Sequence, residues 1–573
     1  MQNEYTVLKT KYADLMDTEH PWQEYPRPTL VRESYFNLNG EWDFCISDTH
    51  PTVYTEKILV PFCPESSLSG YTGKLSENTP LHYRRSFSLS SDFIRKRVIL
   101  HFGAVDTLCE VWLNGTHIGS HEGGYLPFSF DVTEDIKKGE NELYVKVIDN
   151  LDKKYTYGKQ TKKRGGMWYT PVSGIWQTVW LEGVCEDYIE GLKITTDMTS
   201  AKIEVRGGSE KKKITLKGSG EVIEFDGASV TVVPREVHLW SPESPYLYEF
   251  TLECGEDKVE SYFALREVGI GDFDGVKRLT LNGKPYLFNG LLDQGYFPDG
   301  LFLPATKEGY EDDIKSAKSL GFNMLRKHIK VEPEIFYNLC DRLGIVVFQD
   351  MVNNSSYSFL LDTALPTVGL RRLPDKFRHT DKHSREIFIK EMKGTIEHLY
   401  NFPSILYYTV FNEGWGQFCA DEMYALAKSL DSTRIIDATS GWFVRKDSDV
   451  DSRHIYFKPI KIKKKSERPI VISEFGGYSH RVEGHLFGKD NYGYSLYEER
   501  EKFEDAFISL YEEQVLPTIE NGVSALVYTQ ISDVEDETNG LMTYDRAITK
   551  VSKERTLATM NSLYEKLWEV TKK

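Results

Sequence analysis

Length, composition and charge bound the architecture of this chain and its partners. At roughly 150 residues per domain, 573 residues predict three to four domains. The 40% hydrophobic and 27% charged residues indicate folded globular units and exclude fibrous, coiled-coil and largely disordered classes. The 70 basic and 87 acidic residues leave a net charge of −17, which repels nucleic acid and anionic lipid. We therefore expect neither nucleic acid nor a membrane among the partners.

Three further features bear on the cellular compartment. Residues 1–11 include an acid and lack an apolar core, and no run of 18 apolar residues occurs, so neither a secretory signal nor a membrane span is expected. The seven cysteines are odd in number, lie far apart and contain no C-x-x-C pair. We interpret them as reduced thiols and expect a cytoplasmic protein.

The first 184 residues have the pattern of an antiparallel β-sandwich. Short segments of alternating apolar and polar residues are separated by turn residues, as in Arg97–Phe102, Thr107–Trp112, Asn141–Val147 and Gln177–Leu181. The pair Asn114-Gly115 favours a tight hairpin, because both central positions of this turn adopt positive φ. We expect one sandwich domain over residues 1–184.

Residues 185–270 form a second, smaller β territory. Six segments alternate in the same way: Leu192–Thr196, Lys202–Arg206, Lys213–Lys217, Ser229–Val233, Leu247–Glu253 and Lys258–Phe263. Their number and the length of about eighty residues are typical of an immunoglobulin-like β-sandwich.

Residues 271–573 change pattern, because strands now alternate with amphipathic helices. The eight candidate strands are Tyr286–Asn289, Asn323–Arg326, Ile345–Gln349, Ile405–Phe411, Arg434–Ala438, His454–Phe457, Ile470–Ser473 and Ala525–Gln530. The candidate helices include Lys307–Leu320, Glu332–Leu343, Arg385–Tyr400, Ala420–Leu430 and Leu496–Ile519. Eight such units in about 300 residues predict a (β/α)8 TIM barrel. A doubly wound open sheet is the alternative, but no G-x-G-x-x-G follows any strand.

In a barrel of this kind the chemistry belongs at the carboxyl ends of the strands. The fourth predicted strand ends at Asn412-Glu413, and the seventh ends at Glu474. Strands four and seven face each other across the mouth of a closed barrel. A pair of carboxylates there is what glycosidic cleavage needs, one as a proton donor and one as an ionised group facing the anomeric carbon. The alternative is that each glutamate only closes its strand in a salt bridge.

Other strand ends supply polar and aromatic side chains for a pocket around the two acids. Asn412 and Trp415 flank Glu413, and the remaining candidates for substrate binding are Arg326, His328, Asp350, Trp442, His454, Tyr456, Tyr528 and Gln530. Trp415, Trp442, Tyr456 and Tyr528 are the candidates for a sugar-facing aromatic wall. Arg326 has a second interpretation, in which its charge keeps Glu474 or another acid ionised.

At these residues the chain resembles glycoside hydrolase family 2, the retaining exo-β-glycosidases that include β-galactosidases, β-glucuronidases and β-mannosidases. In the first domain the resemblance lies in Phe36–Phe44, His82–Arg85, Val105-Asp106, Val111–Gly115, Gly123–Phe128 and Ser173–Trp176. In the barrel it lies in Leu281–Gly290, Leu320–Arg326, Phe348–Asp350, Phe411–Glu413 and Ser473–Gly476. The resemblance covers nearly the whole chain.

The resemblance implies a sugar-binding jelly-roll sandwich, an immunoglobulin-like second domain and a catalytic barrel. It also implies that Glu413 is the general acid/base, that Glu474 is the nucleophile, and that Tyr456 supports the nucleophile. The implied substrate is a small carbohydrate or glycoside, and neither a cofactor nor a metal is implied.

The chain departs from the family pattern where the sugar is selected. β-Glucuronidases carry an Asn-x-Lys pair after the eighth strand that holds the uronate carboxylate, whereas here Asn539 is followed two places on by Leu541 in an acid-rich loop that begins at Glu535. The loop Asp293–Gly300 likewise replaces an Arg-His that is common in the family. A β-galactosidase-like activity is therefore the main expectation. β-Glucuronidase, β-galacturonidase and α-L-arabinofuranosidase activities are the alternatives within the family.

Two other classes of protein are alternatives to a glycosidase of this kind. A metal-dependent barrel hydrolase needs convergent His and Asp ligands, and the 14 histidines form no H-x-H or H-E-x-x-H. A carbohydrate-binding protein without catalysis would not need both acids with their flanking residues. A homo-oligomer remains an alternative to a monomer.

Overall fold

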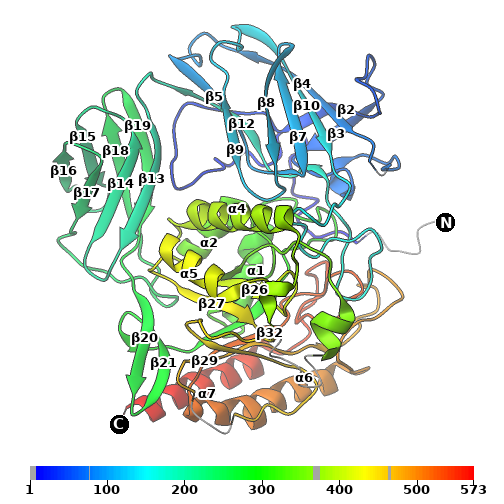
Figure 1. Ribbon diagram of the computed structural model, residues 1–573, viewed down its shortest axis with the longest axis vertical. Coiled ribbons are helices and arrows are strands. Elements are labelled where there is room, and N and C mark those ends of the chain that lie inside the picture. The colour runs from blue at the N-terminus through cyan, green and yellow to red at the C-terminus, as the bar shows by residue number, and fades with distance from the viewer. Residues whose placement is uncertain (1–7, 77, 366–373, 463–465, 573) are drawn as a thin grey trace.

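The computed structural model describes residues 8–76, 78–365, 374–462 and 466–572. Figure 1 shows two antiparallel sandwiches beside each other, with the barrel beneath them. This is the order of units that the sequence predicts. The interpretation of residues 1–11 falls partly on residues 1–7, which lie outside the described ranges. Among the described residues no helix is both long and apolar enough to cross a membrane, and all seven cysteines are free thiols.

The first sandwich packs a four-stranded sheet against a six-stranded one. The four-stranded sheet contains β1 (Tyr35–Asn37), β12 (Val179–Val184), β5 (Arg97–Phe102) and β9 (Phe128–Asp131). The six-stranded sheet contains β3 (Glu56–Val60), β2 (Gly40–Ile46), β4 (Leu81–Leu89), β10 (Gly139–Ile148), β7 (Leu108–Leu113) and β8 (Thr116–Glu122). A short third pair joins β6 (Val105–Asp106) to β11 (Gly174–Ile175).

Alternation along the strands builds the core of this sandwich. In β7 every second side chain is buried, and these side chains share one core with Leu100, Phe102 and Leu181 of the opposite sheet. The predicted hairpin joins β7 to β8, with φ of 52° at Asn114 and 88° at Gly115. That conformation is why this turn favours Asn-Gly.

The second sandwich pairs three strands with four. The first sheet holds β13 (Ile189–Thr196), β14 (Ala201–Gly207) and β17 (Ser229–Val232). The second holds β16 (Val222–Phe225), β15 (Lys212–Leu216), β18 (Tyr248–Cys254) and β19 (Asp257–Phe263). Sequence reasoning misses β16, which is a four-residue edge strand with no fully buried side chain and so carries little hydrophobic signal. The hairpin β20 (Val268–Phe273) to β21 (Val276–Leu281), with β22 (Lys284–Pro285), leads into the barrel.

Eight parallel strands form the near-closed barrel, in the order β27-β26-β25-β24-β23-β32-β29-β28. Their bounds are β23 Phe288–Asp293, β24 Met324–Lys327, β25 Val346–Asp350, β26 Ile405–Asn412, β27 Ile435–Ser440, β28 Asp451–Ile455, β29 Ile470–Gly476 and β32 Val523–Thr529. All eight correspond to predicted strands. The sixth begins three residues earlier than expected, so that His454 lies inside it and Tyr456 just beyond it.

The barrel strands are buried on both faces, as in parallel sheets generally. One face points into the barrel, where Phe288, Phe348 and Tyr407 pack together. The other contacts the surrounding helices, which are α1 (Glu308–Ser319), α2 (Glu334–Leu343), α4 (Lys382–Leu399), α5 (Ala420–Leu430), α6 (Arg500–Ser509) and α7 (Lys553–Thr571). In Figure 1, α4 lies between the first sandwich and the barrel.

The long helix predicted for Leu496–Ile519 is shorter in the structure. Only α6 is α-helical there, and the chain continues as a π turn over Leu510–Val515 and a 3-10 turn over Leu516–Asn521. Pro517 lies in this stretch and has no N–H to donate, so a regular helix cannot pass through it. Hydrophobic spacing alone does not register this interruption.

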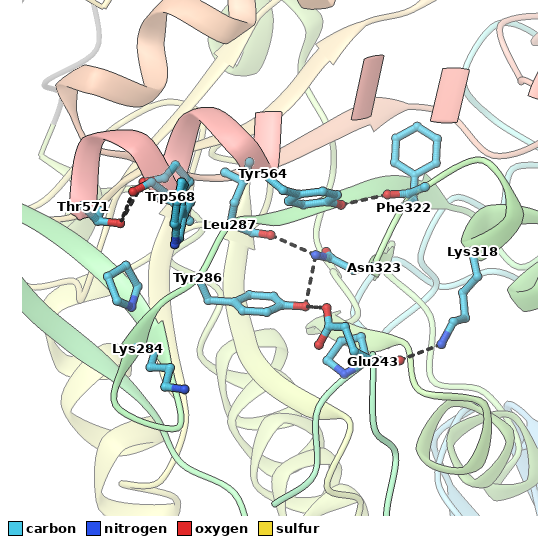
Figure 2. A pocket seen from close by; sticks show the side chains of 14 residues that line it. Glu243, Lys284, Tyr286, Leu287, Lys318, Phe322, Asn323, Tyr564, Trp568 and Thr571 are labelled. Carbon is cyan, nitrogen blue, oxygen red and sulfur yellow. Dashed lines mark hydrogen bonds between the residues drawn. The ribbon is translucent and has the colours of Figure 1, made fainter. Parts of the chain in front are cut away.

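A cavity of about 670 Å³ opens at the amino-terminal end of the barrel strands. Figure 2 shows Trp568 and Tyr564 of α7 on one side of it, and Tyr286, hydrogen-bonded to Glu243, on another. Its lining includes Leu287 and Asn323, which directly precede β23 and β24. The cavity therefore lies at the opposite end of the barrel from the strand exits considered next.

Candidate active site

The two predicted acids lie together at the carboxyl end of the barrel. Glu413 directly follows β26, and Glu474 lies near the end of β29, where the strand register is irregular between Ile472 and Phe475. The backbone of Glu413 is left-handed, with φ of 52°, and the next residue, Gly414, has φ of 73°. This unusual conformation turns the chain sharply at the strand exit, where functional sites often store strain.

The carboxylates of Glu413 and Glu474 approach each other closely. One oxygen of each, together with a ring nitrogen of His454, forms a group whose three atoms all lie within 4.8 Å of one another. The side chain of Glu413 is 14% exposed and that of Glu474 is 7% exposed. Two acids this close, with one slightly more open to solvent, can divide the roles of proton donor and ionised group.

Glu474 is surrounded by donors that favour its ionised form. Arg326 Nη1 lies 3.1 Å from Glu474 Oε1, and the Tyr456 hydroxyl donates to Oε2 at 2.6 Å. Burial acts to raise the pKa of Glu474, but His454 and Arg326 with the Tyr456 hydrogen bond outweigh it, so the pKa lies below its usual value. Burial and the charge of Glu474 raise the pKa of Tyr456 well above its usual value, which keeps its hydroxyl a donor.

Arg326 is the centre of a buried network rather than a surface of the pocket. Its side chain is 1% exposed, and its guanidinium also donates to Asp350 Oδ1 at 3.0 Å and Asn412 Oδ1 at 3.0 Å. Asp350 in turn faces His328 Nδ1 at 2.7 Å. Of the two interpretations of Arg326, the structure favours the one in which its positive charge keeps a neighbouring acid ionised. The sequence also predicts that Arg326 and Asp350 bind substrate, and the structure places both beside Glu474, 1% exposed and hydrogen-bonded to each other.

His454 lies between the two acids. Its Nδ1 is 2.7 Å from Glu413 Oε1 and 3.5 Å from Glu474 Oε2, and its Nε2 is 2.9 Å from Ser440 Oγ. The ring is fully buried. Gly441, with φ of 87°, leaves room for it, because a Cβ at this position would lie 2.5 Å from the imidazole.

The four aromatic residues predicted to face the sugar take different places. Tyr456 contacts Glu474, and Trp442 lies 6.0 Å from His454 between ring centroids. Trp415 packs on Trp168 at 5.1 Å and is 3% exposed.

Tyr528 lies outside this group, which corrects the prediction. Alternate residues of β32 point inward, and Thr529 reaches Tyr456 at 2.8 Å, so Tyr528 points outward. Its ring packs on Phe475 and Phe507, between strands and helices. Gln530, the last predicted residue, is completely buried and donates to Asn539 Oδ1 at 2.8 Å.

Three contributors were missed by sequence reasoning. Ser440 ends β27, so the rule of strand exits could have found it. Tyr494 stacks on Tyr456 at 4.1 Å, but it comes from a loop with no strand-exit signal. Trp168 reaches the barrel mouth from the first sandwich, where Tyr169 also donates a short hydrogen bond to Glu537. Only the tertiary structure reveals contacts between such distant segments.

Among the described residues, Glu413, His454 and Glu474 are the one group whose geometry could hold a metal ion. Each already has hydrogen-bond partners, namely one another, Ser440 and Tyr456. The cluster is therefore satisfied by protein groups alone.

Each of the three structural units matches a known family model. Residues 63–176 match "Glycosyl hydrolase 2 galactose-binding domain-like", residues 188–266 match "Glycosyl hydrolases family 2", and residues 274–571 match "Glycosyl hydrolases family 2, TIM barrel domain". The last match alone spans more than half of the chain.

Curated relatives of low sequence identity include several β-galactosidases. A β-galactosidase of Leuconostoc mesenteroides is 25% identical over 569 aligned residues, which cover 89% of this chain and 50% of that protein. A β-galactosidase of Lactobacillus delbrueckii is 26% identical over 83% of this chain and 46% of that protein. The chain thus spans about half the length of these curated relatives.

Solved structures share the fold over nearly the whole chain. A β-galacturonidase of Eisenbergiella tayi superposes with a TM-score of 0.67 at 22% identity, covering 93% of this chain and 97% of that one. A β-D-glucuronidase of Dictyoglomus thermophilum gives 0.73 at 18% identity, covering 94% and 98%. At these identities the likeness establishes the architecture.

Proposed function

The chain belongs to glycosyl hydrolases family 2, and from this premise we propose that it hydrolyses terminal β-linked sugars from small glycosides or oligosaccharides. The observation that carries the proposal is the pair Glu413 and Glu474 at the barrel mouth, with oxygens within 4.8 Å of each other. Carboxyl groups about 5–5.5 Å apart suit a retaining glycosidase, whereas an inverting enzyme needs roughly 6.5–9.5 Å to admit a water molecule.

In this proposal Glu474 is the nucleophile and Glu413 is the acid. Glu474 attacks the anomeric carbon while Glu413 donates its proton to the departing glycosidic oxygen, which leaves a glycosyl ester on Glu474. Glu413, now ionised, takes a proton from water, and the hydroxide formed cleaves the ester. The support for these roles is the low pKa of Glu474 and the donors Arg326 and Tyr456 on its carboxylate.

For the sugar we propose a β-galactosidase-like preference. The loop after β32 supports it, because Glu535, Asp536 and Glu537 are buried there and would repel a uronate carboxylate. Burial raises the pKa of Glu535 to about 7. Its charge, and with it the repulsion, is therefore fully developed only above neutrality.

The decisive experiment combines a substrate panel with active-site labelling. The p-nitrophenyl β-D-galactoside, glucuronide, galacturonide, mannoside and α-L-arabinofuranoside are compared by kcat/KM, and the anomer first released is read by NMR. We expect galactoside turnover with retention, and a 2-fluoroglycosyl adduct on Glu474. Turnover of none of the five sugars would overturn the proposal, and a label on another residue would overturn the assignment. Glu474→Gln should bind substrate without turning it over.

A further inference from the structure

The imidazole of His454 is the feature of the site that the proposed mechanism does not yet use. It is fully buried between the two carboxylates, on β28, and Gly441 leaves space for it from the neighbouring strand exit. Both nitrogens have partners on other strands, Glu413 and Ser440. A group held this firmly beside both reacting acids is expected to influence proton transfer.

The contacts determine which nitrogen carries hydrogen toward the acids. Nδ1 lies 2.7 Å from Glu413 Oε1 and 3.5 Å from Glu474 Oε2. Glu474 is ionised in the proposed mechanism and can only accept, so we assign a proton to Nδ1 and place the catalytic proton of Glu413 on its other oxygen. The Ser440 hydroxyl at Nε2 can donate to a neutral ring or accept from a charged one. Nδ1–H therefore points at the acids in either state of the ring.

Resting on the proposed function, we propose that His454 is a positioning residue for Glu413. Its Nδ1–H binds Glu413 Oε1, which directs the other oxygen, with the catalytic proton, toward the glycosidic oxygen. When that proton leaves, negative charge moves from Glu474, which becomes an ester, to Glu413. The same N–H lies between both carboxylates and stabilises whichever of them is ionised.

The charged and titratable groups around the ring come from several strands. Glu413 follows β26 and Glu474 lies on β29, while Tyr456 follows on the chain of His454 itself at 6.5 Å between ring centroids. Arg326 and His328, from β24 and its exit, act on the cluster through Glu474. Of these groups, Glu413 is the one at short hydrogen-bond distance from His454.

The test uses two leaving groups. Phenyl glycosides need a proton on the leaving oxygen, whereas 2,4-dinitrophenyl glycosides of the same sugar do not, and kcat/KM reports the first chemical step for both. Positioned acid catalysis is worth about 10²- to 10⁴-fold. We expect His454→Leu to lower kcat/KM about 10- to 100-fold for phenyl glycosides and less than about threefold for dinitrophenyl glycosides. Equal losses on both substrates would overturn the inference.

The pH profile gives a second readout that a merely structural role would not move. Nδ1–H stabilises the ionised form of Glu474, so removing it should shift the acidic limb of the kcat/KM profile to higher pH. His454→Asn, which keeps a donor near the Nδ1 position, should recover part of the phenyl-glycoside activity and return this limb toward wild type. An unmoved acidic limb in His454→Leu would contradict the inference.

Ser440→Ala keeps the test decisive if His454→Leu does not fold. It leaves the imidazole in place but removes the partner of Nε2, so we expect a smaller loss with the same dependence on leaving group. A uniform loss in this variant would overturn the inference. Wild-type inactivity on every glycoside would instead overturn the proposed function, so the two failures are distinguishable.

Discussion

Arg326 of β24 and Glu474 of β29, two strands separated by β23 and β32, meet at 3.1 Å in the barrel mouth, both nearly excluded from water. The same guanidinium binds Asp350 and Asn412. The planar guanidinium holds its acceptors in fixed in-plane directions from three separate nitrogens, whereas the donors of an ammonium group all diverge from one nitrogen. Arg326 thus fixes Glu474, Asp350 and Asn412, the residue before Glu413, relative to one another.

Replacing this arginine should damage catalysis in two separable ways. Arg326→Lys keeps the positive charge but loses the planar guanidinium. We expect kcat/KM to fall at least about tenfold, with little movement of the acidic limb of its pH profile. Arg326→Gln also removes the charge that lowers the pKa of Glu474, so the acid limb should move to higher pH.

Arg434→Lys is the matched control for this pair. Arg434 is equally buried, is bound to Asp431 at 2.6 Å, and also binds carbonyls that lie at the amino-terminal ends of the strands. Its substitution should lower stability and leave the pH profile unchanged. A shifted acid limb in Arg434→Lys would show that the effect of Arg326 is not local.

Tyr456→Phe tests the second donor on Glu474. It removes a 2.6 Å hydrogen bond to a carboxylate, and hydrogen bonds to charged groups are worth about 1.5–3 kcal/mol. We expect kcat/KM to fall about 10- to 100-fold and the acidic limb of its pH profile to move to higher pH. Tyr528→Phe, on the outward face of β32, should stay within about twofold of wild type. Comparable losses in the two variants would contradict the separation of these tyrosines.

The positions of Tyr456 and Tyr528 show which features of the site the sequence specifies and which it does not. Hydrophobic periodicity predicts all eight barrel strands, and the strand-exit rule selects Glu413 and Glu474 as candidates. The same rule does not say which face of a strand a residue occupies. An error of a few residues in a strand boundary changes that assignment, which is why Tyr528 was misassigned.

Contacts between distant segments lie further beyond sequence reasoning. Nothing in the spacing of His454 indicates that it bridges both acids, because that depends on the irregular register at Arg453 and His454. The reach of Trp168 into the barrel mouth depends on how the first sandwich docks. Both relationships follow from packing, which a single sequence does not display.

Trp168→Ala tests whether the first sandwich completes the site. Its ring contacts Trp415 at 5.1 Å and Tyr357 at 5.2 Å. Removing it takes away an aromatic surface beside Trp415, the residue two places after Glu413, so we expect KM to rise about 5- to 20-fold with a smaller change in kcat. Trp180→Ala is the control, since its ring stacks on His101 within the sandwich. An equal rise in KM for both would indicate general loosening of the sandwich.

Glu391 of α4 makes stability depend on pH. Its carboxylate abuts Gly123 of the first sandwich, and burial raises its pKa to about 7, from 4.5. The folded state therefore holds this proton more tightly, so its contribution is complete below about pH 4.5 and is lost as pH rises toward 7. Glu391→Gln removes the penalty, on the order of 3 kcal/mol at pH 8. Measured by Tm, the variant should gain a few degrees on wild type between pH 5 and pH 8. Glu397→Gln, on the exposed face of α4, should gain nothing, and equal behaviour of the two variants would contradict this origin of the pH dependence.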